Sequence, residues 1–343
     1  MRVVKLTRPR VLEPAEEPHP AADGQNVVIN VSACGVCGSD LHYWEMGTGM
    51  DGAPGLIMGH EFSGTVADAG PGSDDLAPGD RVTYIPLNPC NACPTCEKGW
   101  FHLCPRAFTR PVPGNNAPGA FAEKVAGRPD MVRHLPDTVT DEAACLVEPA
   151  AVALHAVKQA GIRLGARVLV IGGGTIGLLS AAWARIAGAS QVGLCERNPK
   201  RLSYAGTWPY VDQAFDAEDK KLKKNLKVAS NGGFDAVIET SAADAGIATA
   251  ISALLPKGAL VLAGINFSPQ AVSTLMLTSK EIRLRGSMAY EINDFDTALG
   301  FMADKRLDVS QMINCRAGFA DLQKIFENLH HGDCEIVKAV VRP

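Results

Sequence analysis

The sequence lacks the features that are typical of proteins that bind nucleic acid or a membrane. Its 343 residues contain 33 Lys and Arg against 37 Asp and Glu, a formal net charge of −4, so no positive excess is available to bind phosphates or anionic lipids. No stretch approaches the roughly 18 uncharged apolar residues that a membrane span needs, and the first 20 residues contain no apolar segment typical of a secretion signal. We therefore expect a cytoplasmic protein that binds a small molecule, with no nucleic-acid partner and no membrane contact.

The sequence also has no internal repeat and no low-complexity segment, which excludes solenoid proteins. With 46% apolar and 20% charged residues, its composition is that of a globular protein rather than a disordered one. At roughly 150 residues per domain, the length predicts about two domains.

The chain changes character near residue 141. The earlier part is rich in glycine and proline and has short β-type runs such as Asn26–Val31, which predicts a β-rich domain. The later part opens with an alanine-rich helical stretch over Glu142–Ala160, and strands then alternate with helices. Such alternation predicts a parallel sheet with helices on both faces. Its strands are expected at Arg167–Ile171, Gln191–Cys195, Phe234–Glu239, Ala259–Leu262 and Glu281–Arg285.

A glycine-rich turn follows the first of these strands. It has the pattern G-x-G-x-x-G at the start of a predicted helix, formed by Gly172, Gly173, Gly174, Thr175, Ile176 and Gly177. Glycine permits the tight turn at the first position, a close approach of the backbone to a pyrophosphate at the second, and close packing of helix on strand at the third. In this context the pattern predicts a dinucleotide-binding site; the alternative is a glycine-rich turn without a ligand.

An acidic residue, Glu196, ends the next predicted strand, 19 residues beyond Gly177. A carboxylate there can accept hydrogen bonds from the adenosine ribose and repels the extra phosphate of NADP, so NAD is the expected cofactor. The neighbouring Arg197 and Arg201 leave use of NADP open. In the alternative interpretation, Glu196 is an ordinary surface residue. Gly264 and Ile265, which follow the strand that ends at Leu262, are also expected to contact the cofactor.

Six of the ten cysteines fall between Cys34 and Cys104. In a chain without a secretion signal, such clustering indicates metal binding rather than disulfides. A loop rich in proline contains four of them, Cys90, Cys93, Cys96 and Cys104, and four thiolates suit a closed tetrahedral site for structural zinc. Buried free thiols and an iron–sulfur cluster are the alternatives. His102 in the same loop is expected to be a spectator.

A second, open metal site is indicated by Cys37 and the pair His60-Glu61. Sulfur, imidazole and carboxylate together suit Zn²⁺ with one position left for water or substrate. These spacings alone leave two alternatives, in which Cys34 and Cys37 form a redox pair or His60 is simply a hydrogen-bonded polar group.

Together these motifs resemble those of the zinc-dependent medium-chain alcohol and polyol dehydrogenases, over essentially the whole chain. The resemblance rests on G-V-C-G-S-D-L-H at 35–42, G-H-E-F at 59–62, the four-cysteine loop, Glu148-Pro149 and the glycine-rich turn, all in the family's order. It implies a GroES-like β-rich catalytic domain over 1–149 with a structural-zinc lobe at 88–106. A Rossmann domain with a doubly wound parallel sheet would follow over 150–289. The segment 290–343 would return to the first domain through a strand near Glu335–Val341, and the protein would be a homodimer or homotetramer.

The resemblance also implies roles for single residues. A catalytic zinc would be held by Cys37, His60 and Glu61 or a water, with Glu148 near enough to exchange in and out. Asp40 would orient His60. Ser39 would take the substrate proton and His42 would help to pass it on. Read without the family, Glu148 is an acid at a helix start, and Ser39 and His42 hydrogen-bond a turn.

The resemblance further implies hydride transfer from a secondary alcohol of a polyol, sugar alcohol or vicinal diol. Tyr43-Trp44 resembles sorbitol dehydrogenases, the segments 86–90 and 60–64 resemble galactitol-phosphate dehydrogenases, and 286–290 resembles butanediol dehydrogenases. Ala289 stands where sorbitol dehydrogenases carry an arginine. A threonine-type amino-alcohol dehydrogenase and a non-catalytic NAD(P)-binding member of the same fold are the alternatives. Five aromatic residues are candidates for a pocket wall or for plain core: Tyr43, Trp44, Phe108, Phe121 and Tyr290. Residues 206–210 depart from the family without a functional explanation.

Overall fold

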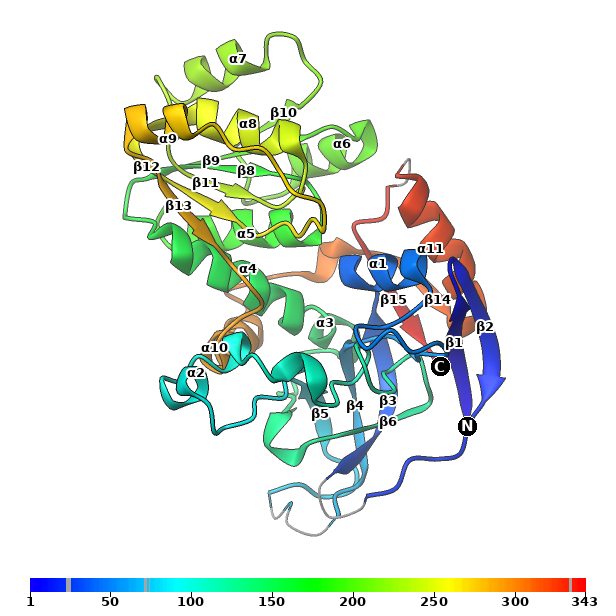
Figure 1. Cartoon of the computed structure of the whole chain (residues 1–343). Coiled ribbons are helices and arrows are strands. Elements are labelled where there is room, and N and C mark those ends of the chain that lie inside the picture. Colours follow the sequence, from blue (N-terminus) through cyan, green and yellow to red (C-terminus); the bar gives the residue numbers. More distant parts are fainter. Residues whose placement is uncertain (23–25, 71–72, 74, 333–334) are drawn as a thin grey trace. The chain divides into compact units, whose positions relative to one another are not determined.

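The structure is a computed structural model that describes residues 1–22, 26–70, 73, 75–332 and 335–343 (Figure 1). The chain divides into two compact units. Unit 1 comprises Met1–Glu148, Glu291–Gly332 and Lys338–Pro343, and unit 2 comprises Pro149–Tyr290 and Asp333–Val337. The C-terminal part of the chain therefore contributes mainly to unit 1.

Unit 2 is built on a six-stranded parallel sheet in the order β10-β9-β8-β11-β12-β13. Because the order runs outward in both directions from the middle, this is the doubly wound topology of the Rossmann fold. The predicted alternation of strands and helices is confirmed. The strands are β8 (Arg167–Ile171), β9 (Gln191–Glu196), β10 (Gln213–Asp216), β11 (Phe234–Glu239), β12 (Leu254–Leu262) and β13 (Arg283–Gly286). The helices are α4 (Val147–Ala160), α5 (Thr175–Ile186), α6 (Pro199–Thr207), α7 (Leu222–Ala229), α8 (Asp244–Ala253) and α9 (Thr274–Lys280).

Helices cover both faces of this sheet, which is why its central strands are mostly apolar. On one face, Leu169, Val237 and Leu260 belong to a buried cluster with leucines and isoleucines of α7 and α8. Helices α4 and α5 lie on the opposite face (Figure 1). There the indole Nε1 of buried Trp183 donates to the Ala150 carbonyl at 2.9 Å and ties α5 to α4.

The helical stretch expected over Glu142–Ala160 is helical but not continuous. The chain forms α3 (Asp141–Ala144) and then α4, with a break between them. Pro149 explains the break, because proline has no N–H to donate to the carbonyl four residues earlier and its ring clashes with that carbonyl. As the third residue of α4, the proline instead occupies a turn whose N–H groups have no partner within the helix.

The unusual segment 206–210 has a structural role that the sequence did not reveal. Trp208, directly after α6, is buried and donates its indole Nε1–H to the Leu178 carbonyl in α5 at 3.0 Å. The ring of Tyr204 stacks on Trp208 with centroids 6.2 Å apart, and the ring of Tyr210 lies 5.5 Å from it. These aromatic residues fasten α6 to the helix that begins at the glycine-rich turn.

Unit 1 is built on a sheet in the order β14-β15-β3-β4-β5-β7, with β6 paired to β3, and on the antiparallel ribbon β1–β2. The C-terminal strand runs antiparallel to β3, with Val340 opposite Gly35 and Val341 opposite Cys34. The strands are β1 (Arg2–Arg8), β2 (Val11–Glu16), β3 (Val27–Gly35), β4 (Glu61–Asp68), β5 (Arg81–Tyr84), β6 (Lys124–Gly127), β7 (Val132–His134), β14 (Ile313–Gly318) and β15 (Lys338–Arg342). The α-helices besides α3 are α1 (Gly38–Met46), α2 (Pro94–Glu97), α10 (Ile292–Ala303) and α11 (Leu322–His331). In the part of the chain that the structure describes, no helix combines the length and apolarity that crossing a membrane requires.

Candidate metal and cofactor sites

Three candidate metal ligands meet in unit 1 where β3 ends and β4 begins. Gly35, the last residue of β3, pairs with Glu61, the first residue of β4. This pairing places Cys37, two residues beyond β3, beside His60 and Glu61. The sulfur of Cys37, a ring nitrogen of His60 and a carboxylate oxygen of Glu61 all lie within 4.8 Å of one another. Such a cluster of thiol, imidazole and carboxylate has the donor set and the spacing for a zinc ion.

Asp40 supports two of these ligands from behind. Its side chain is fully buried, and Oδ2 accepts the backbone N–H of Cys37 at 2.9 Å. Its other oxygen, Oδ1, lies 3.5 Å from Nδ1 of His60. A carboxylate beside the ring nitrogen orients a ligating histidine and strengthens it as a donor.

The electrostatics around His60 favour a bound cation. Burial alone would lower the pKa of His60, but the negative charges of Asp40 and Cys37 outweigh burial and hold this pKa well above its usual 6.5. A metal ion places positive charge at the same point as that proton and can replace it. The residues present therefore fit zinc.

A buried lysine contacts the third candidate ligand, and sequence reasoning missed it. Lys338, the first residue of β15, donates from Nζ to Oε2 of Glu61 and to the Val36 carbonyl, the latter at 3.0 Å. Both charged side chains are 1% exposed, so neither is solvated by bulk water. Burial would lower the pKa of Lys338, but the charges of Glu61 and Cys37 outweigh it and raise this pKa, which keeps the lysine charged.

The predicted proton-transfer residues lie on α1. Ser39 and His42 are three residues apart, so they share one face of this helix, and both are partly exposed. Glu148 is partly buried near the start of α4. Among the described residues, the ligand cluster at Cys37 does not include Glu148. Its role as an exchanging ligand stays a prediction.

The four cysteines of the lobe, Cys90, Cys93, Cys96 and Cys104, lie with their sulfurs within 4.8 Å of one another. Three of them form a small buried cluster packed by Phe101 and Ala107, so the cysteines are themselves the core of this loop. The hydroxyl of Thr95 and nearby N–H groups lower the pKa of Cys93 to about 6, whereas burial raises that of Cys96 to about 11. A loop with such a core suits a structural metal ion, and four thiols would leave no ligand position open.

A hydrogen-bonded clasp closes the base of this lobe, and no sequence motif marked it. The buried side chain of Asn88 donates from Nδ2 to the Pro111 carbonyl at 2.7 Å. Its Oδ1 accepts from Nε of Arg110 at 3.0 Å and from Nη1 of Arg128 at 2.6 Å. The clasp joins the two ends of the loop independently of the cysteines.

The glycine-rich turn in unit 2 lies between β8 and α5. Gly172 has φ +101, and a Cβ at Gly177 would lie 1.8 Å from the Gly172 carbonyl oxygen, so only glycine fits there. A Cβ at Gly174 would meet no atom within 4 Å. The backbone at the N-terminus of α5 is thus open to a ligand, and unsatisfied N–H groups at a helix start attract a phosphate.

Glu196 is buried, which rules out the alternative that it is a surface residue. Its Oε2 accepts the N–H of Gly173 at 2.6 Å, and its Oε1 accepts the N–H groups of Arg197 and Asn198, each at 2.7 Å. A carboxylate has about four acceptor positions, so one remains for a ribose hydroxyl. Sequence reasoning missed that Glu196 also holds the glycine-rich turn in shape.

The other predicted cofactor residues follow the same edge of the sheet, because Gly264 and Ile265 come after β12 just as the glycine-rich turn comes after β8. A Cβ at Gly264 would lie 2.5 Å from the Ala242 nitrogen, whereas Ile265 is 50% exposed. Arg197 is exposed and Arg201 is partly buried in α6. The hydroxyl of Thr175 donates to the Val337 carbonyl at 2.7 Å.

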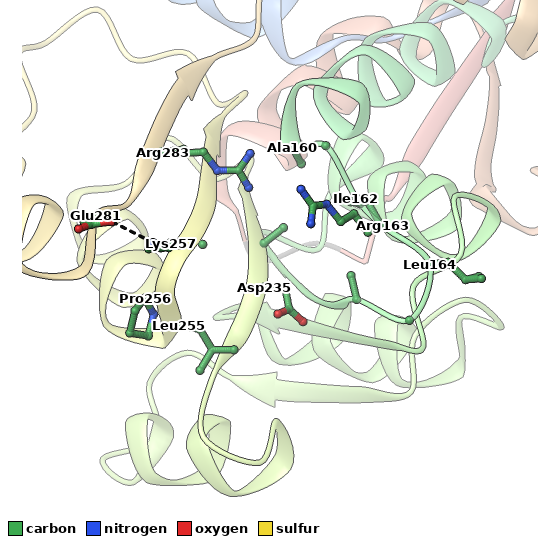
Figure 2. Close-up of a pocket in the computed structure, with 15 residues that line it drawn as sticks. Ala160, Ile162, Arg163, Leu164, Asp235, Leu255, Pro256, Lys257, Glu281 and Arg283 are labelled. Atoms are coloured by element: carbon green, nitrogen blue, oxygen red, sulfur yellow. Dashed lines mark ion pairs between the residues drawn. The ribbon is translucent and has the colours of Figure 1, made fainter.

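A hollow of about 750 Å³ in unit 2 lies at the opposite edge of this sheet (Figure 2). Asp235, Lys257 and Arg283, at or near the starts of β11, β12 and β13, line it together with the loop before β8. Lys257 Nζ lies 3.6 Å from the carboxylate of Glu281. Since cofactors of doubly wound folds bind at the carboxyl ends of the strands, this hollow is not the predicted dinucleotide site.

The structure describes the side chains of four of the five candidate pocket aromatics, and these four are buried. Tyr43 donates its hydroxyl to Oδ1 of Asn115 at 3.2 Å, and Phe121 and Tyr290 are fully buried. The ring of Trp44 packs on Phe326 of α11 with centroids 6.0 Å apart. The side chain of Phe108 lies outside what the structure describes. The described aromatics therefore contribute to the core, and a role in contacting substrate stays a prediction.

Comparison with known proteins agrees with these sites. Residues 23–137 match the family model "Alcohol dehydrogenase GroES-like domain", and residues 175–304 match "Zinc-binding dehydrogenase". The chain is 31% identical to D-xylulose reductase A of Aspergillus niger over 314 residues, which cover 90% of this chain and 87% of the relative. Galactitol-1-phosphate dehydrogenase from Escherichia coli superposes with a TM-score of 0.90 at 27% identity and full coverage of both chains. 2R,3R-butanediol dehydrogenase from Bacillus subtilis superposes with a TM-score of 0.89 at 25% identity, covering 100% and 99%.

These matches span both units, and the relatives share the GroES-like and Rossmann folds. The chain therefore belongs to the zinc-dependent medium-chain alcohol and polyol dehydrogenases, and it is an oxidoreductase of that family.

Proposed function

We propose that this oxidoreductase transfers a hydride from a secondary alcohol of a polyol, sugar alcohol or vicinal diol to NAD⁺ and produces the ketone. The observation that carries the proposal is the cluster of Cys37, His60 and Glu61, with Asp40 behind it. A non-catalytic member of the fold would have no need to keep three ligands and their supporting carboxylate together.

In this proposal, Cys37 and His60 would hold the catalytic zinc together with Glu61 or a water, and Glu148 would be an exchanging ligand. Asp40 fixes the ring of His60 and the backbone of Cys37. When bound, the metal supplies Lewis acidity, which lowers the pKa of an alcohol hydroxyl. Cys90, Cys93, Cys96 and Cys104 hold a second, structural zinc.

The proton of the hydroxyl must leave as the hydride departs. Ser39 Oγ would accept this proton, and His42, on the same face of α1, would help to pass it on to solvent. Imidazole suits this second role because it can take up and release a proton near neutral pH.

The glycine-rich turn binds the pyrophosphate of the cofactor, and the remaining acceptor position of Glu196 binds the adenosine ribose. The same carboxylate disfavours the additional phosphate of NADP. Arg197 and Arg201 are the residues that would accommodate that phosphate if both cofactors were used.

The names of the similar proteins support a polyol-type substrate, since they refer to xylulose, galactitol 1-phosphate and butanediol. Ala289, in place of the arginine of sorbitol dehydrogenases, disfavours sorbitol itself. A cytoplasmic location, a homodimer or homotetramer, and the division into a catalytic domain 1–149, a Rossmann domain 150–289 and a returning segment 290–343 complete the proposal.

The test is a reduced-cofactor absorbance assay of zinc-loaded protein with NAD⁺ or NADP⁺ and a panel of polyols, polyol phosphates, vicinal diols and threonine. We expect turnover with NAD⁺ on one polyol or diol class, and loss of that turnover in Cys37→Ser. Turnover on threonine alone would support the amino-alcohol alternative. If no substrate of the panel is turned over and the protein holds zinc only in the four-cysteine lobe, the catalytic proposal is refuted.

A further inference from the structure

Lys338 brings a permanent positive charge into the candidate metal site. Its side chain is 1% exposed, and Nζ is bonded to Oε2 of Glu61 and to the Val36 carbonyl. A lysine is almost never buried so completely without a specific charge partner. The partner here is itself one of the three clustered metal ligands.

The surrounding backbone fixes this pair in place. The N–H of Val36 donates to the Ala339 carbonyl at 3.0 Å, next to Lys338 in sequence. Gly35 provides the space for the pair, because a Cβ there would lie 2.5 Å from Oε2 of Glu61 and 2.8 Å from Cε of Lys338. The pair therefore occupies space that any side chain at position 35 would fill.

Glu61 thus bonds the lysine and also belongs to the cluster of candidate metal ligands. We propose that Lys338 is a positioning residue that shares the Glu61 carboxylate with the metal. It neutralises Glu61 in the metal-free protein and weakens Glu61 as a ligand in the loaded one, which keeps a coordination position available to the substrate. This inference rests on the proposed function, which places zinc at Cys37 and His60.

Removing Lys338 should change metal affinity, which removing a merely structural lysine would not do. Without Lys338, the metal-free protein would contain an unpaired buried carboxylate, which is strongly destabilising. The loaded protein would suffer less, because the metal supplies the missing positive charge. A loss that falls mainly on the metal-free state must, by linkage, tighten metal binding. In the wild type, the charge of Lys338 also repels the incoming cation, so removing this charge should tighten metal binding further.

The experiment compares Lys338→Met with a matched control in unit 2. Lys280 donates from Nζ to the carbonyls of Ile251, Ser252 and Leu254 at 3.0, 3.1 and 2.7 Å, so Lys280→Met also removes a bonded lysine but lies outside the metal cluster. Zinc affinity is measured by competition with a chromophoric chelator, and Cys37→Ser gives the signal of the four-cysteine lobe alone. Thermal unfolding is recorded with and without zinc at the Cys37 site.

We expect Lys338→Met to bind zinc at the Cys37 site about tenfold or more tightly than the wild type. We also expect its unfolding temperature to fall further without that zinc than with it. Lys280→Met should leave the affinity unchanged and lower both unfolding temperatures equally. An unchanged or weaker affinity in Lys338→Met, with equal losses in both states, would overturn the inference while leaving the proposed function intact. A wild type that binds no zinc beyond the Cys37→Ser baseline would overturn both.

A double variant keeps the test decisive if Lys338→Met does not fold. Lys338→Met combined with Glu61→Gln removes both charges, so it leaves no unpaired buried ion. Recovery of folded protein in the double variant is the expected result. If the double variant also failed to fold, Lys338 would support the fold independently of Glu61, and the inference would be wrong.

Discussion

Removing the side chain of Asn88 should loosen the four-cysteine lobe although Asn88 touches none of its sulfurs in the described contacts. Asn88→Ala loses a neutral hydrogen bond to the Pro111 carbonyl and two bonds from the guanidinium groups of Arg110 and Arg128. A neutral bond contributes about 0.5–1.5 kcal/mol and a bond to a charged group about 1.5–3 kcal/mol. Both arginines are partly exposed, so water can replace their lost acceptor. We therefore expect a loss near the lower sum, about 3.5 kcal/mol.

The assay is denaturant unfolding of the zinc-loaded protein together with the rate at which a chelator extracts the lobe zinc. Asn88→Ala should lower the unfolding midpoint and speed extraction, because the two ends of the loop separate more readily. Asn88→Asp is the control: it replaces the donor to Pro111 with an oxygen but keeps a charged acceptor for both arginines, so its loss should be smaller. An Asn88→Ala variant within about 0.5 kcal/mol of the wild type, with unchanged extraction, would refute the clasp.

Three further changes test other parts of the structure. Gly177→Ala puts a Cβ 1.8 Å from the Gly172 carbonyl oxygen and should weaken NAD⁺ binding about tenfold or more in a fluorescence titration. Gly206→Ala, where the added Cβ meets open space, should leave the affinity unchanged. Equal affinities of the two variants would contradict the geometry of the turn. Asp40→Asn keeps the shape of the side chain but removes the charge beside His60, and it should weaken zinc binding about 10–100-fold in a chelator competition. An unchanged zinc affinity would show that Asp40 does not support the ligands. Trp208→Phe loses the bond to the Leu178 carbonyl and should cost about 1–3 kcal/mol in denaturant unfolding, and a neutral result would remove the role assigned to the aromatic cluster.

The sequence predicted best what depends on neighbouring residues. The strands β8 and β11 have the bounds expected from their apolar runs, because a strand covered on both faces is mostly apolar. The four cysteines that meet in the lobe are close in sequence, so their spacing already implied their proximity. Pro149 shows the limit of such reasoning. The apolar pattern continues across it, but the missing N–H breaks the helix, and the pattern by itself does not record hydrogen bonds.

Side chains whose chemistry depends on distant partners were harder to predict. Glu196 was identified as a ligand for ribose from its position after a strand, yet three N–H groups around it already use most of its acceptor capacity. Asn88 has a polar side chain of ordinary type in a loop, where asparagine is common and usually solvated. Its partners Arg110 and Arg128 both follow the lobe in sequence, 22 and 40 residues after Asn88, and only the fold brings them to one oxygen.

The sequence implies that Lys338 has a carboxylate partner but does not identify which carboxylate it is. A lysine followed by Ala-Val-Val in a buried strand has no access to water, so burial alone requires a carboxylate nearby. The sequence has 37 acidic residues, and nothing local distinguishes Glu61 among them. The choice is made by the register of β15 on β3, which sets Val340 opposite Gly35, together with the register that sets Gly35 opposite Glu61. Two strand pairings of long sequence separation therefore decide which carboxylate the lysine neutralises, and through it the charge of the candidate metal site.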